Sequence, residues 1–250
     1  GVLGKRLADY RQPEREAKIP MMVISPFILN DARRMLISPQ GVSYLMQPPD
    51  NRRRSIQPEI DGVDFSRLFA QQQPDSLAFT TALRMNCTFP FILPNTRLPA
   101  HPALEVMDAG FRDNYGITIA ARFGQVFQDW IRENTSGVLI VQIRCWEKIS
   151  PVEEADNKGI IESLLSPISA AANLTAMQDF EQDMALSLLN DVLGPDQLEV
   201  IRFTYRPMKK ENEASLSLHL SKREKRDILE SFHRPEVRVN VEALKRALGM

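Results

Sequence analysis

The sequence predicts an α/β fold in three layers, with a mostly parallel sheet covered by helices on both faces. The strongest observation is a strand, a helix and a strand in succession over residues 104–145, which is the pattern of a βαβ unit. The run 137–145 is almost continuously apolar, as in strands buried on both faces of a parallel sheet. A length of 250 residues fits one such domain, so we expect residues 1–250 to form a single domain.

The first hundred residues predict short elements joined by loops. Residues 1–19 are charged and predict a helix or an irregular arm, and residues 21–38 predict a hairpin or two neighbouring strands around a turn at Asn30-Asp31. Residues 39–62 are rich in Pro, Arg and Gln, which predicts a long loop. The remaining elements expected here are helices over 64–72 and 74–86 and an extended segment over 87–99.

The centre of the chain carries the clearest helical pattern. After a strand over Leu104–Met107, apolar residues recur at helical spacing from Ile119 to Ile131, which predicts one helix with a wide apolar stripe. A second long loop is expected over 146–173. In the C-terminal part, Thr175 and Gln178 predict a capping box for a helix that starts at Leu174 and is closed by Gly194. A strand is expected over 198–205. Ser221 and Glu224 predict a second capping box, and Asn240 predicts the cap of the last helix.

The composition argues against several classes of function. Lys and Arg number 31 and Asp and Glu 32, so the net charge of −1 gives no basic footprint, and we expect no nucleic-acid partner. The three histidines and two cysteines lie far apart in the sequence, so we expect no metal site and no cofactor. Cys87 and Cys145 sit in apolar surroundings and are expected to be buried, reduced thiols. The sequence has no apolar run long enough for a transmembrane helix.

Asp108 is the first candidate for chemistry, because it follows a strand and precedes the small residues Ala109 and Gly110. A turn at the carboxyl end of a strand is where open α/β sheets place their ligands. Most aspartates in such turns only cap a helix or accept hydrogen bonds from turn amides. Taken alone, the position therefore favours a structural role over a catalytic one.

Three segments in combination resemble the patatin-like phospholipase family, over most of the chain from about Lys18 to its end. The matching residues are Thr88-Phe89-Pro90 within 82–94, Asp108-Ala109-Gly110 and Asp113-Asn114-Tyr115-Gly116 within 105–116, and the segment 215–225. The sequence departs from the family pattern at Ala109, where glycine is usual.

The resemblance implies a lipid acyl hydrolase that uses a Ser–Asp dyad. Asp108 matches the dyad aspartate, the base that takes the proton of the serine hydroxyl, and Ala109, Gly110 and Asn114 match the turn that shapes it. The implied substrate is an acyl ester of a phospholipid or a related lipid, and the implied partner is a membrane surface.

The serine half of the dyad is missing from the sequence. The family's nucleophile lies upstream in G-x-S-x-G, behind a glycine-rich loop, and neither pattern occurs among the 11 glycines. The nearest match, around Ser43, lacks the second glycine. We therefore expect the C-terminal half of a catalytic domain, incomplete at its N-terminal side and inactive alone. The parent protein would be cytoplasmic, or membrane-associated through a region that precedes this chain.

Other interpretations stay open. A non-catalytic lipid- or protein-binding module is the main alternative, and two copies could pair through an exposed sheet edge. Cys87 with His101 as a base fits no known spacing, and a structural thiol is favoured. Arg52-Arg53-Arg54 could touch lipid headgroups, although a solvated loop is favoured there. The apolar stretch 160–174 could also touch a membrane, although packing against the core is favoured.

Overall fold

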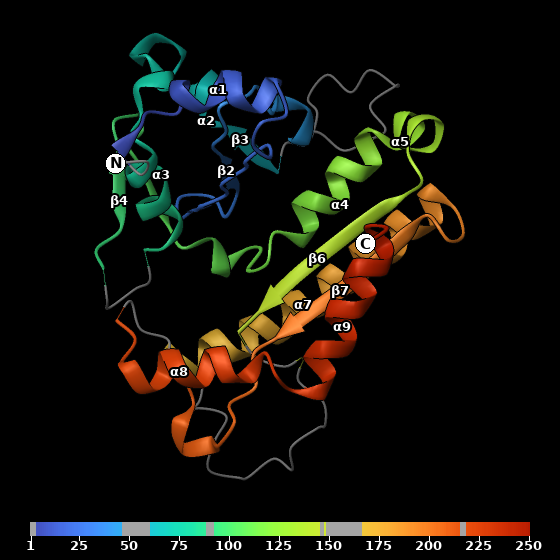
Figure 1. The fold of residues 1–250 in the computed structure, drawn as a ribbon. Helices are drawn as coiled ribbons and strands as arrows, with labels where there is room; N and C mark the ends of the chain where they lie inside the picture. The colour runs from blue at the N-terminus through green and yellow to red at the C-terminus, as the bar shows by residue number, and fades with distance from the viewer. Residues whose placement is uncertain (1–3, 47–60, 89–92, 146–147, 149–166, 216–218) are drawn as a thin grey trace. The chain divides into compact units, whose positions relative to one another are not determined.

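The computed structural model describes residues 4–46, 61–88, 93–145, 148, 167–215 and 219–250, without the side chains of 167–176 and Lys210 (Figure 1). Internal contacts divide the chain into two compact units, each treated by itself below. The first unit comprises residues 1–126 and 173–178, and the second comprises residues 127–172 and 179–250.

The first unit is built on a mixed sheet of five strands in the order β3-β2-β1-β5-β4. These strands are β1 (Phe27–Ile28), β2 (Arg34–Leu36), β3 (Gly62–Asp64), β4 (Thr96–Leu98) and β5 (Leu104–Met107). Only β2 and β3 run parallel, and the other neighbouring pairs are antiparallel. Phe27 at the centre faces Arg34 on one side and Met107 on the other. The predicted pair of strands within 21–38 is confirmed as the β1–β2 hairpin, and the predicted strand Leu104–Met107 is confirmed as β5.

The core of the first unit lies between this sheet and the N-terminal helices. Ile28, Met35 and Val106 are fully buried, and Met85 of a helix packs with them. The helices and turns of the unit are α1 (Ala8–Arg15), η2 (Ser43–Leu45), α2 (Phe65–Leu68), η3 (Ala70–Gln72), η4 (Pro74–Ser76), α3 (Phe79–Asn86), η5 (Ala109–Phe111) and α4 (Ile117–Val126). The charged start of the chain is thus a helix, and buried Leu7 beside it joins the core.

The second unit contains a parallel pair of strands, β6 (Val138–Arg144) and β7 (Leu198–Thr204), with Val138 opposite Leu198. Its helices are α5 (Gln128–Asn134), the part of α7 (Pro167–Leu193) from Asp179 onward, α8 (Lys222–Ser231) and α9 (Pro235–Ala247), with the short turn η6 (Lys210–Asn212). In Figure 1, α7 runs behind the two strands and α9 lies beside β7. The capping box of Ser221 and Glu224 is confirmed at the start of α8.

The polarity of β6 is the reverse of what a buried strand predicts. Gln142 and Arg144 are buried at 3% and 4% exposure, whereas Val141 and Ile143 are exposed at 43% and 77%. The polar side chains are buried because α7 supplies polar partners: Asp179 accepts two hydrogen bonds of 2.7 Å from Arg144. The expectation of a strand buried on both faces was therefore wrong.

The predicted βαβ unit over 104–145 was also wrong. β5 pairs with β1 and β4, and β6 pairs with β7 in a separate sheet. The helix between them is broken at Phe127, whose backbone (φ −100°, ψ 15°) ends α4 before α5 begins. Apolar periodicity fixed the helical type of this segment but not the break, and Trp130 within the expected stripe is 60% exposed.

Two helix boundaries differ from the sequence prediction. α7 begins at Pro167 rather than at Leu174, so Thr175 and Gln178 lie inside the helix and not at its start. Asn240 also lies inside its helix, α9, and donates from Nδ2 to the carbonyl of Arg202 at 2.7 Å. The prediction for Gly194 is confirmed, because Gly194 ends the helix with φ at +102°.

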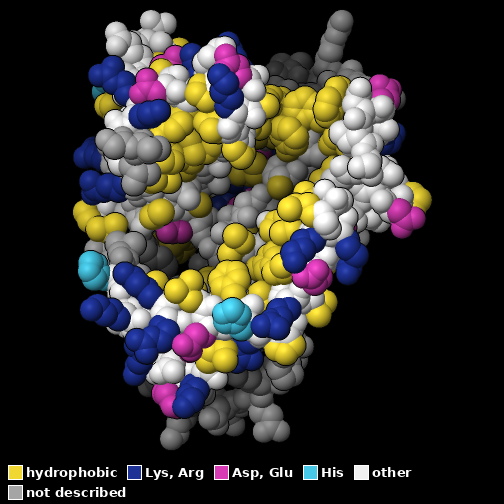
Figure 2. Space-filling view, viewed as in Figure 1, with side chains coloured by type: hydrophobic (Ala, Val, Ile, Leu, Met, Phe, Trp, Pro, Cys, Tyr) yellow, Lys and Arg dark blue, Asp and Glu magenta, His cyan; other side chains and the backbone are white. Residues whose placement is uncertain are grey.

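The chain is therefore α/β with helices and a mixed sheet, and its parallel strand pairs among the described residues are β2–β3 and β6–β7. Arg52-Arg53-Arg54 lies outside the described residues, as do residues 160–166 and most of the two predicted loops. Residues 167–174 are described without their side chains. On the face shown in Figure 2, Lys and Arg side chains are interspersed with Asp and Glu, and apolar side chains form contiguous areas among them.

Candidate functional site

Asp108 follows β5 directly and starts the turn η5. Its backbone N–H donates to the carbonyl of Thr88 at 3.1 Å, which ties the end of β5 to the segment after α3. Its Oδ1 accepts a hydrogen bond of 2.6 Å from the N–H of Gly110. Within the part of the chain that the structure describes, Oδ2 has no hydrogen-bond partner. One carboxylate oxygen is therefore held and the other is available to accept a proton.

The surroundings of Asp108 make its carboxylate more basic than a surface aspartate. Burial raises the pKa of Asp108 above its ordinary value of 3.8, and the hydrogen bond from Gly110 opposes that rise. A carboxylate whose charged form is disfavoured by burial takes up a proton more readily, which is what a general base requires. Such perturbed groups gather at functional sites more often than elsewhere.

Gly110 is needed for space rather than for backbone angles. A Cβ atom at this position would lie 2.7 Å from Asp108 Oδ1 and 3.0 Å from Asn114 Oδ1. Any side chain there would push the carboxylate out of its place. Ala109, by contrast, is buried and has no left-handed backbone, so alanine fits where the family usually has glycine.

The other end of the turn is held from α7. The side chain of Gln178 donates from Nε2 to the carbonyl of Gly110 at 2.7 Å and accepts at Oε1 from the N–H of Asn114 at 3.0 Å. The structure thus brings together all four predicted site residues: Asp108, Ala109, Gly110 and Asn114. Sequence analysis missed Gln178 as part of this site, because its only visible signal was a helix-cap pattern that does not form.

Asp113, in the same segment, has a structural role. Its buried carboxylate accepts hydrogen bonds from the hydroxyl of Thr118 and, at 3.2 Å, from the N–H of Ile119, at the start of α4. Arg34 from β2 lies 3.7 Å from the same oxygen, and it also pairs with Asp61 at 2.7 Å. This saturated carboxylate anchors α4 to the sheet and is not placed to act on a substrate.

Ser43 is not brought to Asp108 but is paired with another aspartate. Its Oγ donates to Asp64 Oδ2 at 2.7 Å. Asp64 is 2% exposed, and its Oδ1 accepts from the N–H groups of Ser66 and Arg67 as the N-cap of α2. The Asp64 carboxylate is already occupied by several donors, so the pair of Ser43 and Asp64 anchors the loop to the start of α2.

The cysteines are exposed and not buried as expected, and neither forms a disulfide. Although Cys87 is exposed, partial burial of its sulfur raises the pKa of the thiol, and the negative charge of nearby Asp108 adds to that rise. A raised pKa keeps the thiol neutral and therefore weakly nucleophilic. Among the described residues, no hydrogen bond joins Cys87 to His101, and His101 is exposed.

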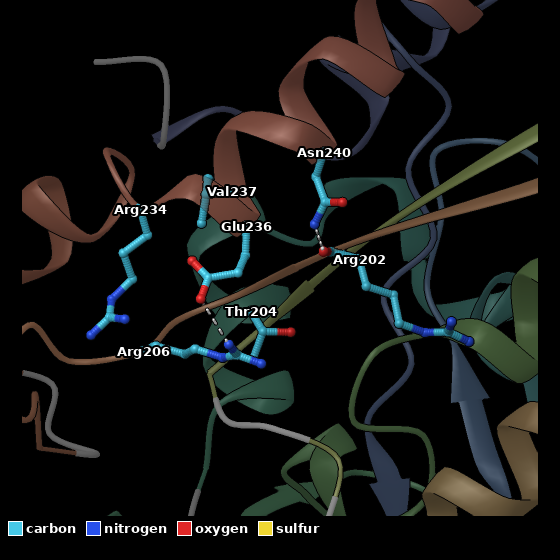
Figure 3. Close-up of a pocket in the computed structure, with 7 residues that line it drawn as sticks. All are labelled: Arg202, Thr204, Arg206, Arg234, Glu236, Val237 and Asn240. Carbon is cyan, nitrogen blue, oxygen red and sulfur yellow. Dashed lines mark hydrogen bonds and ion pairs between the residues drawn. The ribbon is translucent and has the colours of Figure 1, made fainter.

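A separate small pocket of about 150 Å³ lies in the second unit, between β7 and the start of α9 (Figure 3). Arg206 and Glu236 form an ion pair of 3.3 Å inside it, and Arg234 donates to the carbonyl of Pro207. Figure 3 shows the guanidinium group of Arg202 pointing away from the other labelled side chains. The pocket is lined mainly by charged and polar side chains, so it offers little to an acyl chain.

Two features, a metal-binding cluster and a membrane-spanning helix, are absent from the described part of the chain. It contains no group of three or more His, Cys, Asp or Glu side chains arranged to hold a metal ion. None of its helices has the length and apolar character needed to cross a bilayer.

Comparison with known proteins identifies no relative. No protein-family model, no curated protein and no solved structure matches this chain.

Proposed function

We propose that this chain contributes the aspartate of a Ser–Asp dyad to a patatin-like lipid acyl hydrolase. The observation that supports this most is the state of Asp108: one oxygen is held by Gly110, the other is open, and burial makes the carboxylate basic. An aspartate that only capped a helix would resemble Asp113, whose oxygens are occupied by backbone and hydroxyl donors.

The proposed chemistry needs Asp108 as a base and then as an acid. Its open oxygen removes the proton of a serine hydroxyl while the serine oxygen attacks the acyl carbon of the ester. The proton then passes to the departing alcohol, and an acyl-serine remains. In the second step Asp108 takes a proton from water, which attacks the acyl-serine, and then gives that proton to the serine oxygen as the fatty acid leaves.

The serine in this proposal comes from outside the 250 residues. The sequence contains no G-x-S-x-G, and Ser43 is engaged with Asp64. The natural protein that contains this chain would supply the elbow serine and the donors for the oxyanion, and removing such donors alone costs about 10²–10³ in rate. The substrate is an acyl ester of a phospholipid or a related lipid, met in the cytoplasm or at a membrane surface.

The experiment compares ester hydrolysis by the natural protein and by its Asp108→Asn variant. Loss of a general base lowers kcat by about 10²–10⁴, so we expect a drop of that order on a short-chain ester and on diacyl phospholipid vesicles. Asp129→Asn is the matched control, because the side chain of Asp129 is 78% exposed. Full activity in Asp108→Asn would refute the proposal.

A second candidate function, a binding module, is favoured by α7. From Met177 onward its outward face carries Phe180, Met184 and Leu188 at helical spacing, with exposures from 51% to 73%. An apolar stripe of this kind is typical of contact surfaces. A natural protein that hydrolyses no ester would favour this candidate, and pairing of two copies through a sheet edge stays a prediction.

A further inference from the structure

Gln178 binds the Asp108 turn at two points with a single side chain. It is 6% exposed, and its amide bridges the carbonyl of Gly110 and the N–H of Asn114. Gly110 is also the residue whose N–H holds Asp108 Oδ1. The glycine is therefore fixed from both sides, toward Asp108 through its nitrogen and toward Gln178 through its oxygen.

We propose that Gln178 is a positioning residue for Asp108, holding the turn closed so that Gly110 keeps one carboxylate oxygen in place and leaves the other open. The catalytic meaning of this role rests on the proposed function. The positioning itself is a property of this chain and can be measured without any reaction.

The choice of glutamine supports a role beyond packing. The buried face of α7 continues with the polar residues Asp179 and Gln182 and then with Leu186, Leu189 and Leu193. A buried amide costs free energy unless both its donor and its acceptor are satisfied, whereas leucine or methionine would be buried at a gain. Only an amide of this length offers a donor and an acceptor at once, which the carbonyl of Gly110 and the N–H of Asn114 both require.

The expected consequence of losing Gln178 is a looser turn. Gly110 would no longer be held at its carbonyl, so its N–H would leave Asp108 more often. That hydrogen bond opposes the effect of burial on the pKa of Asp108. Without it, the carboxyl should titrate at a higher pH, and its open oxygen should no longer have a fixed direction.

The test uses the 250-residue chain and two variants, Gln178→Met, which removes both hydrogen bonds, and Gln178→Glu, which keeps the acceptor and loses the donor. Gln182→Met is the matched control: Gln182 lies one turn further along α7, is 3% exposed, and accepts a hydrogen bond from Gln142. Titration of the Asp108 carboxyl carbon by NMR and hydrogen exchange of the Gly110 amide are the two readouts.

We expect faster exchange at Gly110, on the order of tenfold in Gln178→Met, and a higher titration midpoint for Asp108 in both Gln178 variants. Gln182→Met should leave both readouts unchanged. Unchanged exchange and titration in a folded Gln178 variant would overturn the proposal, as would equal changes in Gln182→Met. If Gln178→Met does not fold, hydrogen exchange at Gly110 in Gln178→Glu decides, because the added carboxylate raises the pKa of Asp108 by repulsion in any case.

Activity of the natural protein separates this proposal from the proposed function. If both hold, Gln178→Met lowers kcat about tenfold while KM changes little, and Asp108→Asn lowers kcat much further. If the natural protein hydrolyses no ester, the dyad proposal fails, and the NMR readouts still decide whether Gln178 positions Asp108.

Discussion

Replacing Asp113 by asparagine is expected to lower the free energy of unfolding by about 3 kcal/mol, because a buried, saturated carboxylate is lost. The substitution would turn an NH₂ group toward the donors of Thr118 and Ile119 and leave Arg34 with one anionic partner fewer. Asp108→Asn, five residues earlier, is expected to act in the opposite direction.

The sign for Asp108 follows from its raised pKa. A carboxyl whose pKa is higher in the folded state stabilises the fold below the ordinary value of 3.8, and that stabilisation is lost as the pH rises through the raised pKa. At pH 7 the ionised Asp108 is thus a net cost to the fold. Asparagine removes the charge and still accepts from Gly110, so Tm should rise by about 2–4 °C, the change that about 1 kcal/mol produces in a chain of this size.

Urea unfolding at pH 7 measures both variants, with Asp129→Asn as an exposed control expected within about 0.5 kcal/mol of the unaltered chain. Thermal unfolding at pH 7 measures the rise in Tm expected for Asp108→Asn, and this rise should vanish below pH 4. Equal destabilisation by Asp113→Asn and Asp108→Asn would contradict the proposed structural role of Asp113 and functional role of Asp108.

Arg144→Met is expected to destabilise the second unit by about 3–5 kcal/mol, because Asp179 would be left buried without its cation. Arg144 and Asp179 have side-chain exposures of 3% and 4% and are 2.7 Å apart. Burying two charges is costly, so removing both partners should cost much less than removing one.

The double variant Arg144→Met with Asp179→Leu tests this point. We expect it to regain most of the lost stability in urea unfolding. A double variant as unstable as the sum of the two single variants would show that the pair is not coupled, against its two short hydrogen bonds.

Local signals in the sequence predicted local structure well. The β1–β2 hairpin, β5, the cap of α8 and the end of α7 at Gly194 all follow from patterns of a few residues. Which strands pair could not be read in this way. β5 lies between β1 and β4, and no periodicity within 104–145 distinguishes that arrangement from a βαβ unit.

The inverted polarity of β6 was hidden for a similar reason. An apolar run such as that of β6 suits a strand buried on both faces, and only the polar side chains of α7 explain why Gln142 and Arg144 are buried instead. Partners distant in sequence also decide the site. Asp108, Gly110 and Asn114 were predicted from one motif, while Gln178 lies 64 residues beyond Asn114 and has no local signature.

We propose that this chain holds the base of the dyad, Asp108, but not its nucleophile. The most direct measurement is hydrolysis of a short-chain chromogenic ester by the 250-residue chain, beside its Asp108→Asn and Ser43→Ala variants. We expect that none of the three hydrolyses the ester above the rate in buffer. Hydrolysis that disappears in Asp108→Asn would place a nucleophile within the chain, and its loss in Ser43→Ala as well would identify Ser43 and contradict the account.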